Sequence, residues 1–306
     1  MEHPQHPQHP VNETASLSDH VSTFFTQHIS PHHALTRLMY ALTRARYARW
    51  KNWQIRWFIK RYQVDMSIAL EPDAFSHPDF NTFFTRALKP GARPVVNGSH
   101  DIACPVDGAV SQAGVIHDGR IFQAKGQDYS LETLLGGSAE RAAAFMGGTY
   151  ATLYLSPRDY HRIHMPLAGR LLETVYIPGR LFSVNPRTTR CVPGLFARNE
   201  RLVAIFDTAA GPMALILVGA MFVAGIETVW TGPIHQHTRN TLKAWDNRAQ
   251  NITLQHGAEM GRFNMGSTVI VLFGARNGGV GLAAAIQPAA PVEMGQLLAR
   301  NLLKTR

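Results

Sequence analysis

After residue 95 the chain repeats one local pattern, in which short runs of β-branched and other apolar residues are separated by Gly and Pro. Such runs are typical of strands joined by turns. We expect strands at 102–110, 121–124, 149–155, 171–176, 202–207, 213–223, 226–230 and 268–273. Short helices are expected at 131–135 and 139–145, while 292–303 fits a helix or a strand. The pattern predicts a mainly antiparallel β core.

The segment from Pro31 to Tyr62 has helical spacing of its apolar residues, with leucines at 35, 38 and 42 and tryptophans at 50, 53 and 57. Residues 20–64 contain no Asp or Glu but carry eight cations: Arg37, Arg44, Arg46, Arg49, Lys51, Arg56, Lys60 and Arg61. An amphipathic helix with an aromatic face and basic flanks is typical of a segment that lies in an anionic lipid interface. The alternative is a surface helix packed on the core with Lys and Arg around its rim.

The formal net charge of +9 is concentrated in this segment. Without its eight cations, 22 of the 30 Lys and Arg residues remain against 21 Asp and Glu, so the rest of the chain is nearly neutral. A local basic patch favours one anionic surface over a protein that tracks nucleic acid, and we expect no nucleic-acid partner. The sequence has no apolar run long enough to span a bilayer and no secretory signal pattern. Cys104 and Cys191 are expected to be buried thiols in a reducing compartment.

Three regions follow from these patterns. Residues 1–30 form a His/Pro-rich tail that is expected to be disordered. Residues 31–95 are expected to form a helical membrane-associating segment that ends in the Pro/Gly loop after Lys89. Residues 96–306 are expected to form a β-rich catalytic domain. The predicted fold class is therefore α+β, with N-terminal amphipathic helices followed by a mainly antiparallel β core.

The stretch Gly261–Phe273 places a Gly-Ser-Thr step directly before an apolar, β-branched run. Gly266 has no Cβ, so the hydroxyl of Ser267 can approach the carbonyl carbon before it. The run from Val269 to Phe273 would anchor this step on a buried strand. A Gly-Ser-Thr step alone is most often a turn before a core strand, so its significance depends on the rest of the chain.

A histidine-rich block follows the expected strand 149–155. In Ser156–Pro166, Ser156 is suited to cap a helix, Pro157 to its first position and Asp159 to its first turn. In one helical turn His161 and His164 would share a face. The pair could be structural or hold a metal ion, but no third credible ligand lies nearby, and we expect no metal.

An acidic residue, Asp107, lies in Pro105–Gly108 among turn residues, where an Asp commonly makes a local turn. A carboxylate, an imidazole and a serine hydroxyl are also the groups needed to activate a weak nucleophile. Sequence order does not exclude such a triad.

Across residues 34–273 the chain resembles the pyruvoyl-dependent phosphatidylserine decarboxylases, most closely their bacterial membrane-bound members. The resemblance rests on the blocks 80–86, 105–108, 125–131, 156–166, 178–185, 195–201, 226–230 and 259–263. The bacterial form usually has Leu-Gly-Ser-Thr where this chain has Met265-Gly266-Ser267-Thr268. A Leu to Met change nearly conserves volume and leaves the reacting atoms unchanged.

The resemblance implies that the precursor cuts itself. Asp107 and His164 would make Ser267 a nucleophile toward the carbonyl of Gly266. An N-to-O acyl shift followed by elimination would separate a large chain, 1–266, from a small chain, 267–306. Loss of ammonia from the dehydroalanine at 267 would leave a covalent pyruvoyl group. The two chains would form a heterodimer, and two heterodimers could pair.

The resemblance also implies the reaction. The pyruvoyl carbonyl would form a Schiff base with the serine amine of phosphatidylserine and act as electron sink when CO₂ leaves, giving phosphatidylethanolamine for phospholipid biosynthesis. His161 would return a proton to the substrate's α carbon. Phe182, Ser183 and Asn185 would help hold the head group. The enzyme would lie peripherally on the cytoplasmic side of the cell membrane, where the basic helix meets the anionic lipid.

Two alternatives use the same residues differently. A serine hydrolase would direct Ser267, His164 and Asp107 at an external lipid ester, but the Gly-x-Ser-x-Gly pattern is absent around Ser267. A basic membrane-binding protein without activity would explain residues 34–62 and leave the blocks 156–166 and 261–273 without a role.

Overall fold

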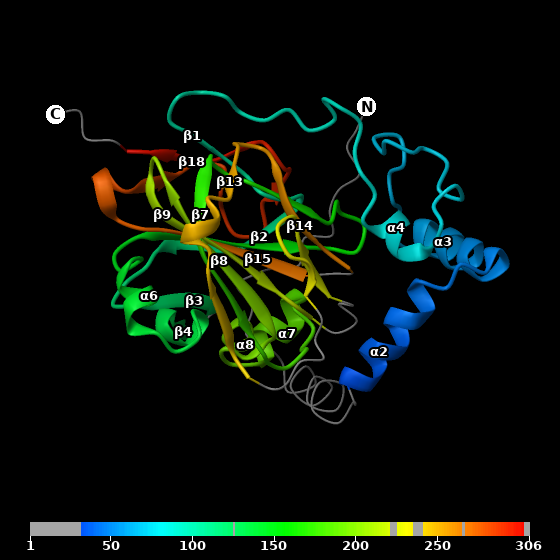
Figure 1. The fold of residues 1–306 in the computed structure, drawn as a ribbon, viewed down its shortest axis with the longest axis horizontal. Coiled ribbons are helices and arrows are strands. Elements are labelled where there is room, and N and C mark those ends of the chain that lie inside the picture. Colours follow the sequence, from blue (N-terminus) through cyan, green and yellow to red (C-terminus); the bar gives the residue numbers. More distant parts are fainter. Residues whose placement is uncertain (1–31, 125, 221–224, 235–240, 265–266, 303–306) are drawn as a thin grey trace.

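The computed structural model describes residues 32–124, 126–220, 225–234, 241–264 and 267–302 (Figure 1). The helices are α2 (His32–Thr43), α3 (Ala48–Tyr62), α4 (Phe80–Phe84), α5 (Leu131–Leu134), α6 (Ala139–Ala143), α7 (Pro186–Cys191) and α8 (Leu195–Arg198), with 3-10 turns η2 (Arg248–Gln250) and η3 (Arg276–Gly278). The predicted disordered tail, 1–30, and Gly266 lie outside the described residues.

The helical segment forms two helices where the sequence predicts one continuous pattern. Residues 44–47 separate α2 from α3, and Gln63, with φ of 54°, ends α3. Ile55 and Phe58 on α3 pack against the three phenylalanines of α4, which begins where the Asp79 side chain accepts a hydrogen bond from the Thr82 amide at 2.8 Å. The helices α2, α3 and α4 lie at one side of the molecule (Figure 1). No helix in the described ranges has both the length and the apolar content needed to cross a membrane.

After α4, the strands in the described part of the chain pair antiparallel, and the largest sheet among them has nine strands. Along this sheet the order is β12 (Lys243–Asp246), β7 (Gly169–Ile177), β8 (Arg201–Thr208), β9 (Gly211–Val218), β15 (Ser267–Phe273), β5 (Thr149–Leu155), β2 (Gly108–Val115) and β17 (Pro291–Val292), with β13 (Thr253–Leu254) also paired to β7. Every residue of β15 is buried, because β5 and β9 flank it and both faces of the sheet are covered. The uninterrupted apolar run 269–273 is the sequence signature of this central position.

Smaller sheets complete the fold. One contains β11 (Gly232–Ile234), β10 (Ile226–Thr228), β14 (Glu259–Phe263) and β6 (Arg162–His164); another contains β1 (Asp101–Ala103), β18 (Leu297–Asn301) and β16 (Val280–Leu282); a hairpin joins β3 (Arg120–Ala124) and β4 (Gln127–Ser130). The undecided segment 292–303 therefore contains a strand, because β18 pairs with β1 and β16. The predicted strand 102–110 is interrupted, and its two ends belong to different sheets.

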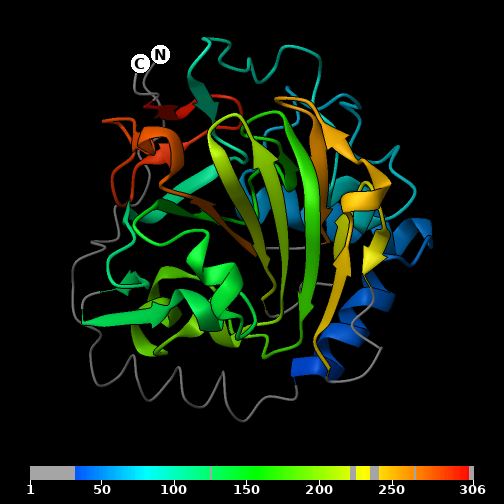
Figure 2. The same cartoon turned by 60° about the vertical axis from the view of Figure 1, so that its left-hand side comes forward.

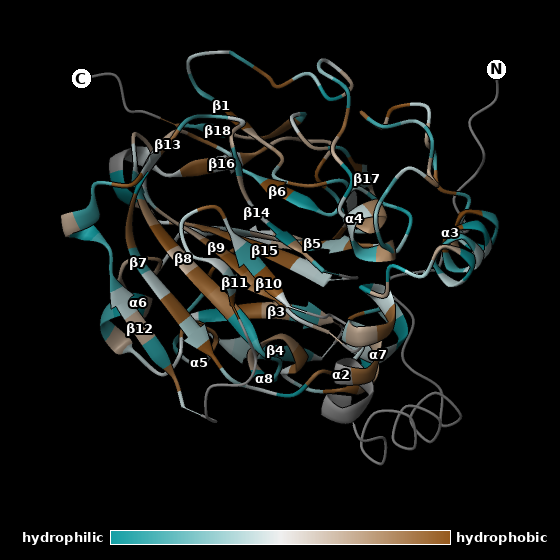
Figure 3. Ribbon diagram, turned by 45° about the vertical axis from the view of Figure 1, so that its right-hand side comes forward, coloured by the Kyte–Doolittle hydropathy of each residue, from teal (hydrophilic) through white to brown (hydrophobic). Residues whose placement is uncertain are grey.

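The layers follow from these sheets. The short helices α5 to α8 and the β3–β4 hairpin lie on one side of the large sheet, and the sheet that contains β1 and β18 lies on the other (Figures 1 and 2). The central strands are the most hydrophobic part of the ribbon (Figure 3), and they form one continuous core. The predicted α+β class is confirmed. Of the two free thiols, Cys104 is buried and Cys191 half-buried.

Candidate active site

Ser267 is the first residue of β15 and pairs with Leu155, the last residue of β5. The chain leaves β5 at Leu155 and continues directly into the block that contains both histidines. The Ser267 side chain is fully buried, and its Oγ has no hydrogen-bond partner among the described residues. A buried hydroxyl without a partner is rare and costly, which marks this atom as a candidate reacting group.

The block after β5 is not helical, so the predicted helix at Ser156 is wrong. Residues 156–159 form a turn in which the Asp159 carboxylate accepts a hydrogen bond from the Ser156 amide at 2.6 Å. The chain then enters β6, which pairs with β14 in the second sheet. Tertiary strand pairing thus outweighs the local capping signals. Burial raises the pKa of Asp159.

His161 is fully buried just before β6. Its Nδ1 lies 2.8 Å from the carbonyl oxygen of Asp159, and because a carbonyl only accepts, Nδ1 carries the proton. The other ring nitrogen, Nε2, has no partner in the described part of the chain. Burial, with a smaller contribution from the charge of Arg86, lowers the pKa of His161 to about 3. The ring is therefore neutral and presents an available lone pair at Nε2, while Phe84 of α4 packs on it with ring centroids 4.1 Å apart.

His164, at the end of β6, has both ring nitrogens engaged. Nδ1 donates to the carbonyl of Gly257 at 2.8 Å, and Nε2 accepts from the Tyr160 hydroxyl at 3.0 Å. Burial is the main cause that lowers the pKa of His164. Its backbone amide donates to the carbonyl of Pro105 at 2.9 Å, which joins β6 to the segment that carries Asp107.

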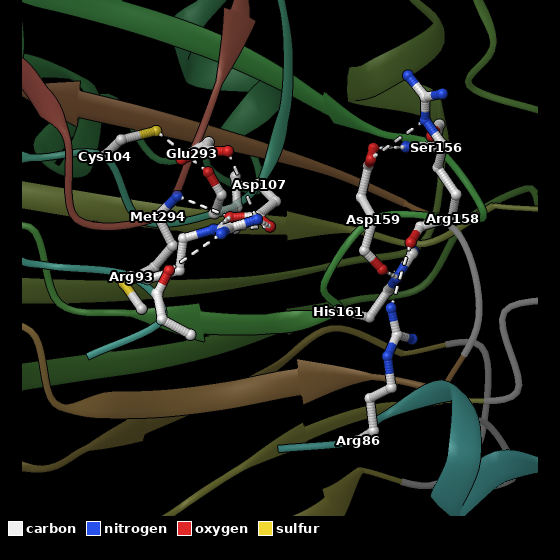
Figure 4. Close-up of polar contacts among 12 residues, drawn as sticks. Arg86, Arg93, Cys104, Asp107, Ser156, Arg158, Asp159, His161, Glu293 and Met294 are labelled. Carbon is white, nitrogen blue, oxygen red and sulfur yellow. Dashed lines mark hydrogen bonds and ion pairs between the residues drawn. The ribbon is translucent and has the colours of Figure 1, made fainter. Parts of the chain in front are cut away.

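Asp107 is held by Arg93 and by a backbone amide. Arg93 donates from Nε and Nη2 to the carboxylate at 2.8 to 3.1 Å, and the Met294 amide donates to Oδ1 at 2.8 Å (Figure 4). Neither imidazole is a hydrogen-bond partner of Asp107 within the described ranges. Arg93 lies in the loop after Lys89, and nothing in the sequence indicates its pairing with Asp107.

The backbone nevertheless brings the Asp107 segment to the same place as Ser267. Gly108 has φ of +153°, and a Cβ there would lie 2.2 Å from the carbonyl oxygen of Tyr154. Only glycine permits this approach. The backbone at Asp107 and Gly108 therefore packs against the end of β5, next to Leu155, which pairs with Ser267. The segments that carry the three residues of the predicted triad lie at one end of β5. The side chains of Asp107 and His164 have other partners there, and the Ser267 Oγ has none among the described residues.

The predicted head-group residues lie between β7 and α7. Asn185 caps α7 by accepting from the Thr188 amide at 2.9 Å, and it donates to the Ser183 hydroxyl at 3.0 Å. Phe182 is buried, with its amide donating to the side chain of Asn199 at 3.1 Å. The helix cap at Asn185 and the hydrogen bonds of Asn185 and Phe182 thus explain part of the sequence pattern at 182–185.

A largely apolar cavity of about 300 Å³ lies next to this segment. Its wall includes Val184 and Pro186 from the head-group segment and Ser156, Arg158 and Asp159 from the turn after β5. Phe182, Ser183 and Asn185 are not part of this wall. A cavity that joins these two segments can accept a small polar group with an apolar extension.

Comparison with known proteins agrees with this arrangement. Residues 80–300 match the family model described as phosphatidylserine decarboxylase, and residues 23–63 match a second model described as PSD. The chain is 55% identical over 274 residues to the phosphatidylserine decarboxylase proenzyme of Bordetella avium, an alignment that covers 90% of this chain and 92% of the relative. It is 55% identical over 280 residues to the Pseudomonas aeruginosa proenzyme of the same name, covering 90% and 95%. The chain therefore belongs to the phosphatidylserine decarboxylase family.

Proposed function

We propose that this protein decarboxylates phosphatidylserine to phosphatidylethanolamine with a pyruvoyl group that it makes from its own Ser267. The observation that carries the proposal is the buried, unpartnered Oγ of Ser267 at the start of β15, beside the histidine-bearing segment. The relatives are named proenzymes, which supports an activating cut.

Self-cleavage requires the Ser267 hydroxyl to lose its proton as Oγ attacks the carbonyl of Gly266. An imidazole that is neutral can take this proton, and burial favours the neutral form of both His161 and His164 by lowering their pKa values. We assign the step to His164, assisted by Asp107. In this assignment the His164 Nε2 exchanges its bond to Tyr160 for one to Ser267. The resulting ester would be cut by elimination, which leaves chains 1–266 and 267–306 as a heterodimer, and two heterodimers would pair.

The decarboxylation step needs an electron sink and a proton carrier. When present, a pyruvoyl group at 267 supplies a carbonyl that takes up the electron pair released with CO₂. The chain supplies the proton carrier at His161, whose Nε2 lone pair can accept the proton that the substrate ammonium must lose. The same nitrogen can return that proton to the substrate's α carbon. Because the His161 side chain is fully buried, bulk water does not compete for this proton.

Membrane association is a second part of the proposal, and α3 carries it. Trp53 and Trp57 are 55% and 51% exposed, and Leu38 on α2 is also exposed. Arg49, Arg56 and Arg61 on the same helix are also exposed, and most of the α3 ribbon is hydrophilic (Figure 3). Exposed aromatic residues flanked by cations are suited to the anionic lipid interface. We place the protein peripherally at the cytoplasmic side of the cell membrane.

Two residues of this helix have roles other than the predicted ones. Lys51 is only 8% exposed, and its ammonium group donates to the carbonyls of Phe75 and His77 at 2.6 Å each. Lys51 therefore anchors α3 to the following loop. Trp50 is half-buried and donates from Nε1 to the Leu42 carbonyl at 3.2 Å, which ties α3 to α2. The inserting face is reduced to Trp53 and Trp57.

The mass of the purified protein tests the proposal. Wild-type protein should consist of chains 1–266 and 267–306, with the smaller chain beginning at a pyruvoyl group, and should release CO₂ from labelled phosphatidylserine. Ser267→Ala should remain one chain and release none. An active wild-type protein with a single full-length mass contradicts the proposal. If the protein is instead a serine hydrolase, the wild type should remain one chain and should release fatty acid rather than CO₂.

A further inference from the structure

Two arginines, Arg86 and Arg201, are almost completely buried, with exposed fractions of 4% and 3%. Their surroundings differ. Arg201 donates from Nε, Nη1 and Nη2 to three carbonyl oxygens, those of Leu134, Asn199 and Thr133, at 2.6 to 2.8 Å. Arg86 has one long hydrogen bond, from Nη2 to the Arg158 carbonyl at 3.3 Å, and its Nε has no partner among the described residues. Each nitrogen of Arg201 thus has an acceptor, whereas the Nε of Arg86 has none.

Arg86 also lacks a counter-ion within the described ranges. The acidic residues whose charges act on it are Asp107, Asp65 and Asp159, but each has closer partners. Asp107 is held by Arg93 and Asp159 by the Ser156 amide, while Asp65 accepts from the Ser67 amide. Burial consequently lowers the pKa of Arg86. The guanidinium carbon of Arg86 lies 5.7 Å from the centroid of the Phe83 ring, a contact that offsets only part of the cost of burial. A buried cation with neither a counter-ion nor a full set of acceptors remains costly, which favours binding of an anion from outside the chain.

The position of Arg86 identifies where such an anion would lie. Arg86 follows α4, whose Phe84 packs on His161, and its guanidinium reaches the backbone of Arg158 (Figure 4). Residues 156, 158 and 159 of the same turn line the cavity of about 300 Å³. Two polar atoms without partners, Nε of Arg86 and Nε2 of His161, thus belong to residues that contact one turn of the chain. A ligand that binds at this turn would give both nitrogen atoms a hydrogen-bond partner.

We propose that Arg86 binds the phosphodiester of the phospholipid substrate, an inference that rests on the proposed function. A guanidinium presents parallel N–H donors that match two phosphate oxygens. The phosphodiester keeps its charge throughout the reaction, so pairing it with Arg86 strengthens binding of the substrate and of the transition state equally. The substrate carboxylate loses its charge as CO₂ leaves, so pairing it with a cation would stabilise the reactant and slow the step. The phosphodiester is therefore the better partner.

Arg86→Met tests this inference in the full-length, processed protein, with Arg201→Met as the matched control. Arg86→Met should still cut into two chains, and its Tm without lipid should equal or exceed that of the wild type, because an unpaired buried charge is removed. Its KM for phosphatidylserine in mixed micelles should rise roughly 10- to 100-fold with kcat largely retained. Arg201→Met should lower the Tm, because it removes three buried hydrogen bonds to carbonyl oxygens.

Two soluble probes identify the anion. Glycerophosphoethanolamine carries the phosphodiester without the carboxylate, and serine carries the carboxylate without the phosphodiester. Titration calorimetry should show that Arg86→Met weakens binding of glycerophosphoethanolamine and leaves binding of serine unchanged, while Arg86→Lys gives an intermediate loss. The opposite pattern would assign Arg86 to the carboxylate and overturn the inference.

Other outcomes are equally decisive. A lower Tm with blocked cutting in Arg86→Met would make Arg86 a structural anchor of the Arg158 turn and overturn the inference. An unchanged KM for phosphatidylserine in Arg86→Met would also overturn the inference. If the wild-type protein neither cuts nor releases CO₂, the proposed function itself fails, and the inference fails with it. If the wild type does both, a negative result with Arg86→Met leaves the proposed function intact.

Discussion

Ser267 pairs with Leu155 across the antiparallel ladder between β15 and β5, so the serine lies where the chain leaves β5 for its two histidines. The close approach of Gly108 to Tyr154 brings the Asp107 segment to the same end of β5. Three sequence blocks, near residues 107, 160 and 267, are thereby brought to the same end of β5. The relationship depends on backbone pairing alone, so point substitutions of the polar side chains should change chemistry without moving the site.

The first prediction separates the two histidines. His164→Ala should slow self-cleavage by at least about 100-fold, because the serine hydroxyl then lacks its base. His161→Ala should still yield two chains and a pyruvoyl group but should release little CO₂. Gel analysis of chain cleavage and CO₂ release from labelled substrate are the two measurements.

The opposite pattern has a definite meaning. An uncut His161→Ala beside a processed His164→Ala would assign the base to His161, whose Nε2 is unpartnered in this structure, and would contradict our assignment. Tyr160→Phe is a useful companion variant, because it removes the hydroxyl that occupies the His164 Nε2. If His164 is the base, Tyr160→Phe should cut at least as fast as the wild type.

The second prediction concerns Asp107. Asp107→Asn should remain largely uncut, since an amide cannot offset the positive charge of an imidazole that has taken a proton. It should also lower the free energy of unfolding by about 1 to 3 kcal/mol, because Arg93, itself mostly buried, loses its carboxylate. Asp128→Asn is the matched control, since Asp128 pairs with Arg120 at the exposed surface. Urea unfolding and intact mass measure both effects; normal cutting in Asp107→Asn would remove Asp107 from the mechanism.

The sequence predicts the bounds of the central strands better than it predicts the local structure of the segments that carry the triad. Thr149–Leu155 matches β5 in both bounds and 268–273 matches β15 to within one residue, because continuous apolar runs occur where a strand is covered on both faces. The turn at Ser156 is mispredicted because its capping residues are local signals, whereas the pairing of β6 with β14 connects residues about a hundred positions apart. The sequence pattern predicts α5 and α6 but not α7 and α8, which are similarly short. A helix of one or two turns contains too little pattern to be predicted consistently.

Side-chain partners were harder to predict than positions. The chemistry of their side chains points to Ser267, His164 and Asp107, and the fold brings their segments together. The sequence does not point to Arg93 or Arg86, since an arginine in a Pro/Gly loop or after a phenylalanine-rich helix has no spacing that indicates its partner. Contacts between distant loops depend on the tertiary arrangement, which a local pattern does not contain.

The third prediction tests the membrane face. Replacing Trp53 and Trp57 by Ser should release the protein from anionic vesicles and leave self-cleavage intact, because both side chains are more than half exposed and lie outside the core. Trp245→Ser is the matched control, since Trp245 is an exposed tryptophan on β12. Each cation near the surface contributes about 1 kcal/mol, so added salt should weaken binding without abolishing the apolar part. Vesicle co-sedimentation measures this, and unchanged binding by the double variant would contradict the role of α3.

The last prediction concerns Glu200, a buried carboxyl group just before β8. Burial raises its pKa from 4.5 to about 7, and a hydrogen bond with Tyr176 opposes part of that rise. The neighbouring Arg201 does not neutralise it, because the guanidinium donates to carbonyls. Between pH 4.5 and 7 the folded state holds a proton that the unfolded state has released. Stability contributed by this group therefore falls as pH rises through that window, by about 1.4 kcal/mol per pH unit, and is constant above it.

Glu200→Gln isolates this contribution. Buried histidines such as His161 have lowered pKa values and act in the opposite direction below pH 6.5, but they are common to both proteins and cancel in the difference. The free energy of unfolding of Glu200→Gln minus that of the wild type should thus rise between pH 5 and 7 and level off by pH 8. Tyr176→Phe should move the upper end of the window to higher pH, because it removes the bond that lowers the pKa of Glu200. Urea unfolding at four pH values tests both variants, and a difference that does not change with pH would mean that Glu200 is ionised in the folded protein.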